Sequence, residues 1–405
     1  TRILPPNAFR DMIVDGIIGG VGGVIIFLPN ILILFFFITL MEASGYMARV
    51  AFIVDKLMHK IGLHGKSFVP MLMGFGCNVP AIMATRTIEN KNDRLVTMLI
   101  IPFMSCSARY PVYILIIGAF FASYQGTLLF GIYLFGIFLA GIMAWIFKKT
   151  IFKASTIPFV MELPPYRMPR MASVLKQTWF KGEMYLKKMG TIILLASILI
   201  WAMGYFPLGK KYEVVFNNKV EQINKQATTK LKQGNLSPAQ IKTLEASRER
   251  KINILKDELA MKKQENSVIG RIGHFIEPVI RPLGFDWKMG VSLIAGGAAK
   301  EVVVSTMGVL YPSSSGKEGK EGLGQRLRKQ VYSSGPHKGQ KVFTPLAALA
   351  FLLFILIYFP CIAVVAAIKN ETGQWKWSLF LAVYTTTLAW VVAFIVFQGG
   401  SLLGF

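Results

Sequence analysis

Residues 73–113 read MGFGCNVPAIMATRTIENKNDRLVTMLIIPFMSCSARYPVY, and this stretch decides the fold. Two apolar segments flank a short charged turn, and each carries a cysteine close to a proline, Cys77 in the first and Cys106 in the second. Because proline has no backbone N–H, Pro80 leaves the carbonyl of Gly76 without its helical partner. The pattern therefore predicts helices that are interrupted at both cysteines.

Interrupted helices have a restricted place in membranes. Unwound backbone survives at membrane depth only where protein buries it or where it lines a wet cavity. Transporters use broken helices with free carbonyls to build ion sites near the middle of the bilayer. The competing interpretation is that the glycines ease helix packing and that each cysteine is a small apolar filler. Two cysteines beside breaks in consecutive segments favour the site.

The composition predicts a membrane protein. The chain has 405 residues, of which 53% are apolar, and a mean hydropathy of +0.50. These values exceed those of soluble domains and predict an all-α, polytopic bundle of transmembrane helices. The formal net charge of +24 fits cytoplasmic loops and lipid headgroups better than nucleic acid, because the lysines are spread over several loops. Only three cysteines occur, all within apolar runs, which argues against a disulfide framework.

The chain divides into three regions. Residues 1–206 are expected to form a first membrane half with a gate segment at 68–113. Residues 207–289 are a lysine-rich helical insert followed by an interfacial helix, and residues 290–405 form a second membrane half with a gate segment at 290–311. Because the chain opens with Thr-Arg-Ile-Leu and no signal peptide, it is expected to be a fragment of a longer protein.

A faint repeat relates the two halves. GCNVPAIMAT at Gly76–Thr85 can be laid on GAAKEVVVST at Gly297–Thr306, which indicates an inverted repeat with a binding site at its interface. Lys300 and Glu301 lie inside the second segment, where ionisable residues are functional candidates. The alternative is that this pair lies at a segment end near the membrane surface.

Charge distribution predicts the orientation. Placing the basic turn at 86–94 and the loop at 148–188 in the cytoplasm puts the 210–289 region outside and the 312–341 loop inside. The Phe68–Ala84 segment must then be re-entrant rather than spanning. Glu42 follows a long apolar run, so it either faces a cavity or lies at the interface and pairs with Arg49.

The available side chains favour a soft or borderline metal ion. Thiols, carboxylates and freed carbonyls suit Fe(II), and Met104 close to Cys106 leaves Cu(I) as an alternative. Histidine is missing from the spans, which disfavours zinc. The segment GLHGKS at 62–67 fails as a phosphate-binding loop, because Lys60 stands where a glycine is needed. No nucleotide site is therefore expected in this chain.

Several motifs resemble one known family. GFGCNVPAIMATRT, PFMSCSARYPVY, AAKEVVVST and YFPCIA are similar to the membrane domain of the bacterial ferrous iron transporter B family, and LMEASGYMAR and ETGQWKW also match. The resemblance covers nearly the whole chain except the insert. It implies two gate segments and import of Fe(II) across the bacterial inner membrane. Ser107 departs from the family, where glycine is usual.

The resemblance also implies partners. Family members carry an N-terminal GTP-binding domain, which is not expected within this chain, so any GTPase activity would reside outside it. Small accessory proteins and a homo-oligomer are further expectations, and the transported Fe(II) is the only expected cofactor. The alternatives are a permease for Mn, Zn, Cu or a nucleoside-like solute, and a membrane scaffold or sensor in which the cysteines are fillers.

Residues of two kinds are expected to form the site. The residues expected to contact the ion along its path are Cys77, Cys106, Glu42, Glu301, Cys361, Asn78, Met104 and Ser105. The residues expected to shape the gate backbone are Gly74, Gly76, Pro80, Pro102, Gly296, Gly297 and Lys300.

Overall fold

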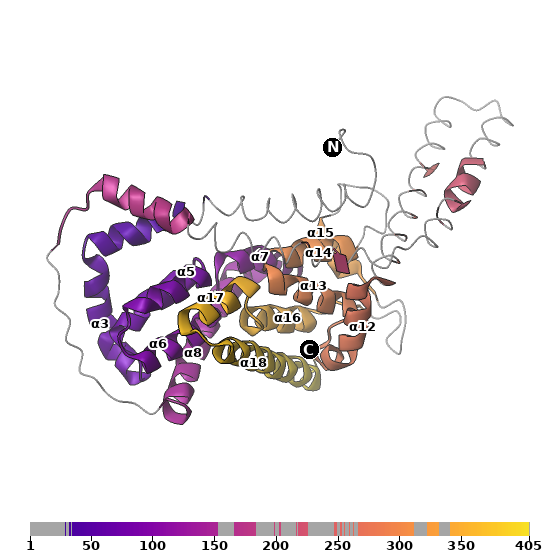
Figure 1. Ribbon diagram of the computed structural model, residues 1–405. Helices are drawn as coiled ribbons and strands as arrows, with labels where there is room; N and C mark the ends of the chain where they lie inside the picture. The colour runs from indigo at the N-terminus through magenta and orange to yellow at the C-terminus, as the bar shows by residue number, and fades with distance from the viewer. Residues whose placement is uncertain are drawn as a thin grey trace.

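The described residues of the chain fold almost entirely into helices (Figure 1). The computed structural model describes residues 35–152, 166–183, 266–311, 322–331 and 341–404, with scattered positions between them. The β pairing within these ranges is an isolated antiparallel bridge between Val331 and Lys341. The predicted all-α bundle is therefore confirmed.

The first half contains a bent pair, two broken helices and one long helix. The helix Phe35–Ala43 meets α3 at an angle of 86°. The elements that follow are α3 (Tyr46–Lys60), α4 (Phe68–Gly74), α5 (Asn78–Ala84), α6 (Lys91–Ile100), α7 (Tyr110–Phe120) and α8 (Gln125–Thr150). The chain breaks between α4 and α5 at Phe75–Cys77, where the glycines and Pro80 oppose a continuous helix. It breaks again between α6 and α7, around Pro102 and Cys106.

The second half follows the same plan. Its helices are α12 (Val268–Ile280), α13 (Trp287–Ala298), α14 (Val302–Leu310), α15 (Leu323–Lys329), α16 (Pro345–Ile357), α17 (Ile362–Thr372) and α18 (Trp375–Leu402). Breaks separate α13 from α14 at Ala299–Glu301 and α16 from α17 at Tyr358–Cys361. In both halves, two broken helices are followed by one long helix, and α8 and α18 have 26 and 28 residues.

The faint sequence repeat corresponds to a repeated order of helices in the two halves. Cys77 starts the second helix of the first broken pair, and Glu301 starts its counterpart. Laying Gly76 on Gly297, as the sequence suggests, places Cys77 opposite Ala298, so the structural correspondence is shifted by three residues. That the second copy is inverted stays a prediction.

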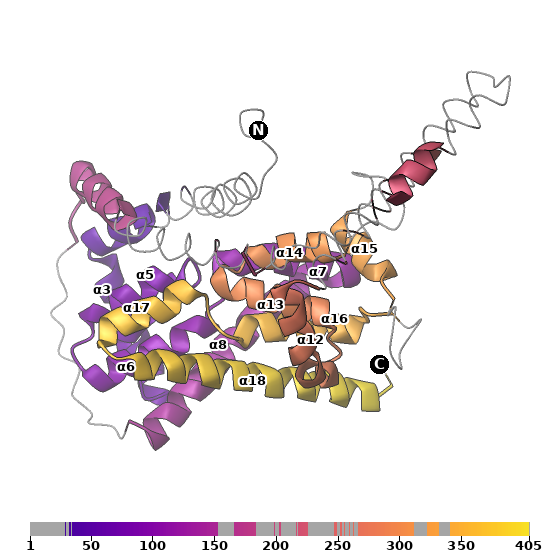
Figure 2. The same cartoon turned by 45° about the vertical axis from the view of Figure 1, so that its right-hand side comes forward.

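The broken helices occupy the centre of the bundle. The second member of each pair crosses to the other half: α5 packs against α17, and α14 packs against α7. Figures 1 and 2 show α5 and α17 side by side, with α18 running beneath α16 and α17. Tyr384 of α18 donates a hydrogen bond to the carbonyl of Leu99 at the end of α6, which fastens the long helix of one half to a broken helix of the other.

Four helical segments in the described ranges are long and apolar enough to cross a membrane, or five if the bent pair counts as one. They are Lys91–Phe120, Ala122–Thr150, Pro345–Thr372 and Trp375–Leu402. The α4–α5 pair is not among them, because each helix has only seven residues and extends about 10 Å. The insert at 210–266, most of the first apolar segment at 15–40 and the span predicted at 189–206 lie largely outside the described residues.

Candidate functional site

The four helix breaks surround one small cavity of about 80 Å³. Every break contributes to its wall, although the breaks are up to 285 residues apart in the sequence, from Gly76 to Cys361. The wall consists of Gly76, Cys77, Asn78, Val79, Cys106, Ser107, Ala108, Arg109, Ala298, Ala299, Lys300, Glu301, Pro360, Cys361 and Ala363. The three cysteines and Glu301 therefore face a common space.

A side chain able to bind metal precedes each helix that leaves this cavity. Cys77 is the N-cap of α5, Glu301 of α14 and Cys361 of α17, while Cys106 precedes the short turn that leads into α7. The N-terminal ends of helices carry partial positive charge, so those of α7, α14 and α17 favour negative charge on a thiolate or carboxylate.

Ser107 ties the two breaks of the first half together. Its backbone N–H lies 3.2 Å, and its Oγ 3.0 Å, from the carbonyl oxygen of Gly76, and both donate to it. This carbonyl is the one that Pro80 deprives of a helical partner. The freed group predicted from the sequence is therefore satisfied across the cavity wall by the neighbouring break.

Lys300 makes the corresponding tie in the second half. Its Nζ donates to the carbonyl oxygen of Phe359 at 2.5 Å and lies 3.3 Å from the centre of the Tyr358 ring. The residue is only 3% exposed. A buried ammonium group needs such partners because removal from water destabilises an isolated charge. Lys300 thus joins the break before α14 to the break before α17.

Arg109 is a cavity residue that the sequence analysis missed. Its side chain is 1% exposed, and its guanidinium donates to the carbonyl oxygens of Pro102 at 2.9 Å and Met104 at 3.4 Å. It therefore satisfies carbonyls that the broken α6–α7 segment leaves free. The signal was present, since an arginine within an apolar membrane run is a functional candidate by default.

Asn78 lines the cavity and also carries a buried polar atom without a partner in the described part of the chain. The residue is 4% exposed, and its Oδ1 has no hydrogen-bond partner among the described residues. A buried carbonyl oxygen without a partner is disfavoured by about 1–3 kcal/mol. Such an atom indicates a site where a transient ligand supplies the missing interaction.

Other predicted residues lie outside the small cavity. Met104 is 1% exposed and packs against Gly74, where an added Cβ would lie 2.9 Å from the Met104 Cβ. The Ser105 hydroxyl donates a 3.0 Å hydrogen bond to the hydroxyl oxygen of Tyr113. Gly296 and Gly297 lie in the last turn of α13 beside Tyr358 and Phe359, and the structure places them around the wall rather than in it.

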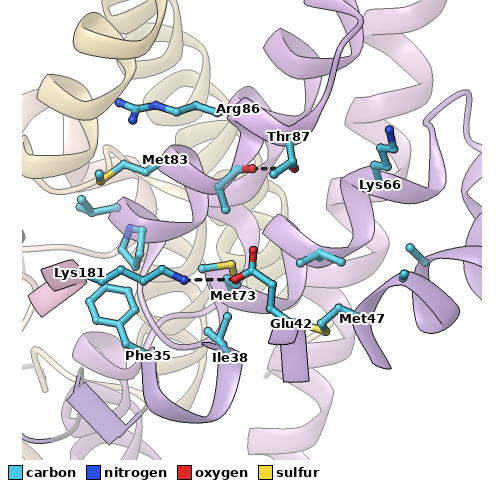
Figure 3. Close-up of a pocket in the computed structure, with 16 residues that line it drawn as sticks. Phe35, Ile38, Glu42, Met47, Lys66, Met73, Met83, Arg86, Thr87 and Lys181 are labelled. Atoms are coloured by element: carbon cyan, nitrogen blue, oxygen red, sulfur yellow. Dashed lines mark hydrogen bonds and ion pairs between the residues drawn. The ribbon is translucent and has the colours of Figure 1, made fainter. Parts of the chain in front are cut away.

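Glu42 lies in a second, larger cavity of about 500 Å³ (Figure 3). Its carboxylate is 3.2 Å from the Nζ of Lys181, on the helix over 171–183, and Arg49 instead donates to the carbonyl of Gly45. The wall comprises Phe35, Ile38, Glu42, Met47, Ala48, Ala51, Lys66, Val69, Met73, Val79, Pro80, Met83, Ala84, Arg86, Thr87 and Lys181. Glu42 and the thiols are therefore not brought together.

Metal-binding geometry is not assembled in this conformation. Across the described part of the chain, no three His, Cys, Asp or Glu side chains are grouped closely enough to hold a metal ion. The thiols and Glu301 line one cavity without converging on a single point. An ion would therefore complete its ligand set with backbone or amide oxygens, or with a small inward movement of the wall.

Two family models match this chain. The family described as Gate, nucleoside recognition, matches residues 24–120 and 186–375, and the family described as ferrous iron transport protein B C terminus matches residues 129–181. The first covers more than half of the chain.

Curated relatives match over nearly the whole chain. A protein named "Fe(2+) transport protein A/Fe(2+) transporter FeoB fusion protein" from Porphyromonas gingivalis is 54% identical over 98% of this chain and 45% of its own length. Proteins named "Fe(2+) transporter FeoB" are 46% identical in Campylobacter jejuni and 43% identical in Helicobacter pylori, over 96% and 97% of this chain and 55% and 57% of their own. The chain thus spans about half the length of these relatives. No solved structure matches significantly.

Proposed function

Because this chain belongs to the Gate family and corresponds to the C-terminal membrane part of the ferrous iron transporter B proteins, we propose that it carries Fe(II) across a membrane through the cavity between its four helix breaks. The observation that supports this most strongly is the position of Cys77, Cys106 and Cys361 on the wall of one cavity. The direction is into the cytoplasm of a bacterial cell.

The wall supplies ligands of the right chemistry. Fe(II) is a borderline ion that accepts thiolate, carboxylate and carbonyl oxygen together. Cys77 and Cys106 are the principal ligands of the first half, and Glu301 with Cys361 completes the set from the second half. Asn78 Oδ1 lacks a partner among the described residues and offers an oxygen to an entering ion.

Charge on the wall makes proton release part of binding. Lys300 and Arg109 place two basic side chains on the cavity wall, against one acidic side chain, Glu301. A dication added to this set would be repelled unless thiols lose their protons, because thiolates and not thiols are metal ligands. Binding of Fe(II) is therefore expected to release protons and to weaken as the pH falls.

The small size of the cavity favours an ion over an organic solute. Sites for small organic molecules are typically about 300–1,000 Å³, whereas the cavity between the breaks measures about 80 Å³. The second candidate, a permease for a nucleoside-like solute, gains support only from the description of the matching family. Fe(II) fits both the volume and the thiol chemistry.

The transport step is proposed to need further parts of a longer protein. A GTP-binding domain would supply energy or regulation from outside this chain. A small accessory protein is a second proposed partner, and the P. gingivalis relative bears a name that joins transport protein A to the transporter in one chain. The chain itself acts as the permease and not as an enzyme.

The test compares metals and thiols under anaerobic conditions. Cells that lack other ferrous importers and produce the protein should take up radioactive Fe(II), and the purified protein should bind Fe(II) with release of protons. Replacement of Cys77, Cys106 and Cys361 together by serine should abolish both. Uptake that survives this replacement at normal protein levels would overturn the proposal, as would binding that prefers a nucleoside to Fe(II).

A further inference from the structure

The larger cavity lies directly behind the small one. Val79, in the first turn of α5, lines both, and this residue is 2% exposed. Asn78, its neighbour, lines the small cavity, while Pro80 and Met83 belong to the larger one. A single buried turn of helix therefore separates the proposed ion site from a space about six times its size.

Basic residues lie at one end of the larger cavity (Figure 3). Lys66 and Arg86 lie on its wall, and Lys66 pairs with Glu89 while Arg86 pairs with Glu371. Further cations gather at the same end, because Arg94 shares Glu371 and Lys148 pairs with Asp93. Clusters of Lys and Arg mark the cytoplasmic side of a membrane protein.

The wall suits a passing soft cation better than an anion. Each of its three cations is already matched by a carboxylate, since Lys181 pairs with Glu42 at 3.2 Å. Figure 3 shows Glu42 and Lys181 pointing toward each other, with the sulfur of Met73 beside them and Met47 near Glu42. Thioethers are compatible with a borderline metal, and the Lys181–Glu42 pair joins a half-buried ammonium to an exposed carboxylate at 3.2 Å, so its contribution to stability is small.

The cavity exists because α3 diverges from the core. Near its middle, α3 is held tightly: Gly65 donates to Asp55 at 2.7 Å, and an added Cβ at Gly65 would lie 2.5 Å from the carbonyl of Ala51. The N-terminal part of α3, with Met47 and Ala48, instead borders the empty space. In the second half, the corresponding helix α12 packs closely on α13, where a Cβ at Gly273 would lie 2.6 Å from Val291.

We propose that the cavity between α3, α4 and α5 is the cytoplasmic vestibule through which the ion leaves the site between the breaks. This inference rests on the proposed function. The turn Asn78–Pro80 is the barrier, and displacement of α5 into the hollow beside α3 opens it. Asn78 accompanies the ion across the barrier, and Glu42 receives it after exchange of its Lys181 partner.

Filling the vestibule tests the route. Ala48→Phe on α3 and Ala84→Phe on α5 place rings in the larger cavity without touching the wall of the small one. Fe(II) uptake should fall at least tenfold, while equilibrium Fe(II) binding to the purified variants stays within twofold of wild type. Val383→Phe, at a 56% exposed position on α18, is the matched control and should change neither. Uptake within twofold of wild type in both filled variants would overturn the vestibule.

A second measurement does not depend on transport. Met83→Cys places a thiol in the larger cavity, and a charged, membrane-impermeant thiol reagent should label it in inside-out vesicles but not in right-side-out vesicles, beyond the labelling of the wild-type cysteines. Labelling from the outer side, or from neither side, would overturn the proposal even if the filled variants lose binding through misfolding. A wild-type protein that binds no Fe(II) would instead refute the proposed function.

Discussion

The two halves of this protein share one plan but place different chemistry on it. In the first half, the breaks carry Cys77 and Cys106 and are tied by the neutral contact between Ser107 and Gly76. In the second half, they carry Glu301 and Cys361 and are tied by the ammonium of Lys300 on Phe359. In the first half, α3 precedes the breaks and borders the larger cavity. In the second half, the corresponding helix α12 packs closely against α13.

The two halves therefore share the same order of broken helices, but the side chains at the breaks differ, and we infer that the halves differ in function. Helix breaks at equivalent places bring side chains to the centre whatever those side chains are. Two of the three cysteines on the wall of the small cavity lie in the half that borders the larger cavity, and each half contributes one buried basic residue to that wall, Arg109 in the first and Lys300 in the second. We therefore expect the first half to move during transport and the second to remain fixed.

Removing sulfur from the first half should have the largest effect. Cys77→Ser is expected to lower Fe(II) uptake about 100-fold, because loss of a direct metal ligand exceeds the 10–100-fold cost of disturbing a ligand's support. Cys361→Ser should lower it less. Ser305→Ala, an exposed position on α14 that removes a similar polar group, is the control. Equal losses of Fe(II) uptake in Cys77→Ser and Cys361→Ser would contradict the larger role assigned to the sulfur of the first half.

Breaking the charged link between the halves should follow in size. The Glu371 carboxylate at the end of α17 is 4% exposed and pairs with Arg86 and Arg94 from the first half. Glu371→Ala leaves both guanidinium groups without this partner and should lower the free energy of unfolding by about 3 kcal/mol. Thermal unfolding in detergent would measure it.

The control for that link is the exposed ion pair of Lys66 with Glu89, whose carboxylate is 88% exposed. The Lys66 partner also lowers the pKa of Glu89. Glu89→Ala should leave the free energy of unfolding nearly unchanged, because exposed ion pairs contribute little. A loss at Glu89 equal to that at Glu371 would show that the buried carboxylate does not join the halves.

Two glycines of α8 test how closely a long helix must approach a break. A Cβ at Gly136 would lie 2.7 Å from the carbonyl of Phe103, whereas nothing lies within 4 Å of a Cβ at Gly131. Gly136→Ala should therefore destabilise the protein by about 1–3 kcal/mol. Gly131→Ala should be neutral or stabilise it by up to about 1 kcal/mol. Identical unfolding temperatures for the two variants would contradict the close contact.

The smallest expected effect concerns the hydrogen bonds by which Ser107 joins the two breaks of the first half. Ser107→Ala removes the hydroxyl donor to Gly76 but keeps the backbone donor, so stability should fall by about 0.5–1.5 kcal/mol. If the tie restrains the moving half, the rate of Fe(II) uptake should rise a few-fold. Removal of the exposed hydroxyl of Thr386, which bonds within α18, should leave the rate unchanged. A lower rate in Ser107→Ala would mean that the hydroxyl assists transport.

Much of the fold could be predicted because it depends on local chemistry. Pro80 and the neighbouring glycines interrupt a helix wherever it lies, and long apolar runs form spans. The breaks at Cys77 and Cys106 were therefore visible in the sequence. The break before Cys361 was only partly visible, since a proline beside a cysteine was noted there but no third gate was inferred.

Which residues line the cavity depends on tertiary packing, and this packing cannot be predicted from local sequence patterns. Met104 lies close to Cys106 in sequence, yet extended backbone at the break turns it into the core against Gly74. Glu42 is separated from the thiols by α5, and only the tertiary structure places it in another cavity. Arg109 is marked as a candidate by its position in an apolar run, but its partners, the carbonyls of Pro102 and Met104, are defined only by the folded break.

X-ray absorption at the iron edge, on protein loaded anaerobically with one Fe(II), tests the central claim most directly. The account predicts sulfur bound directly to iron, with fewer sulfur neighbours in Cys77→Ser and none when Cys77, Cys106 and Cys361 are all replaced by serine. Iron surrounded only by oxygen and nitrogen in the wild-type protein would contradict it.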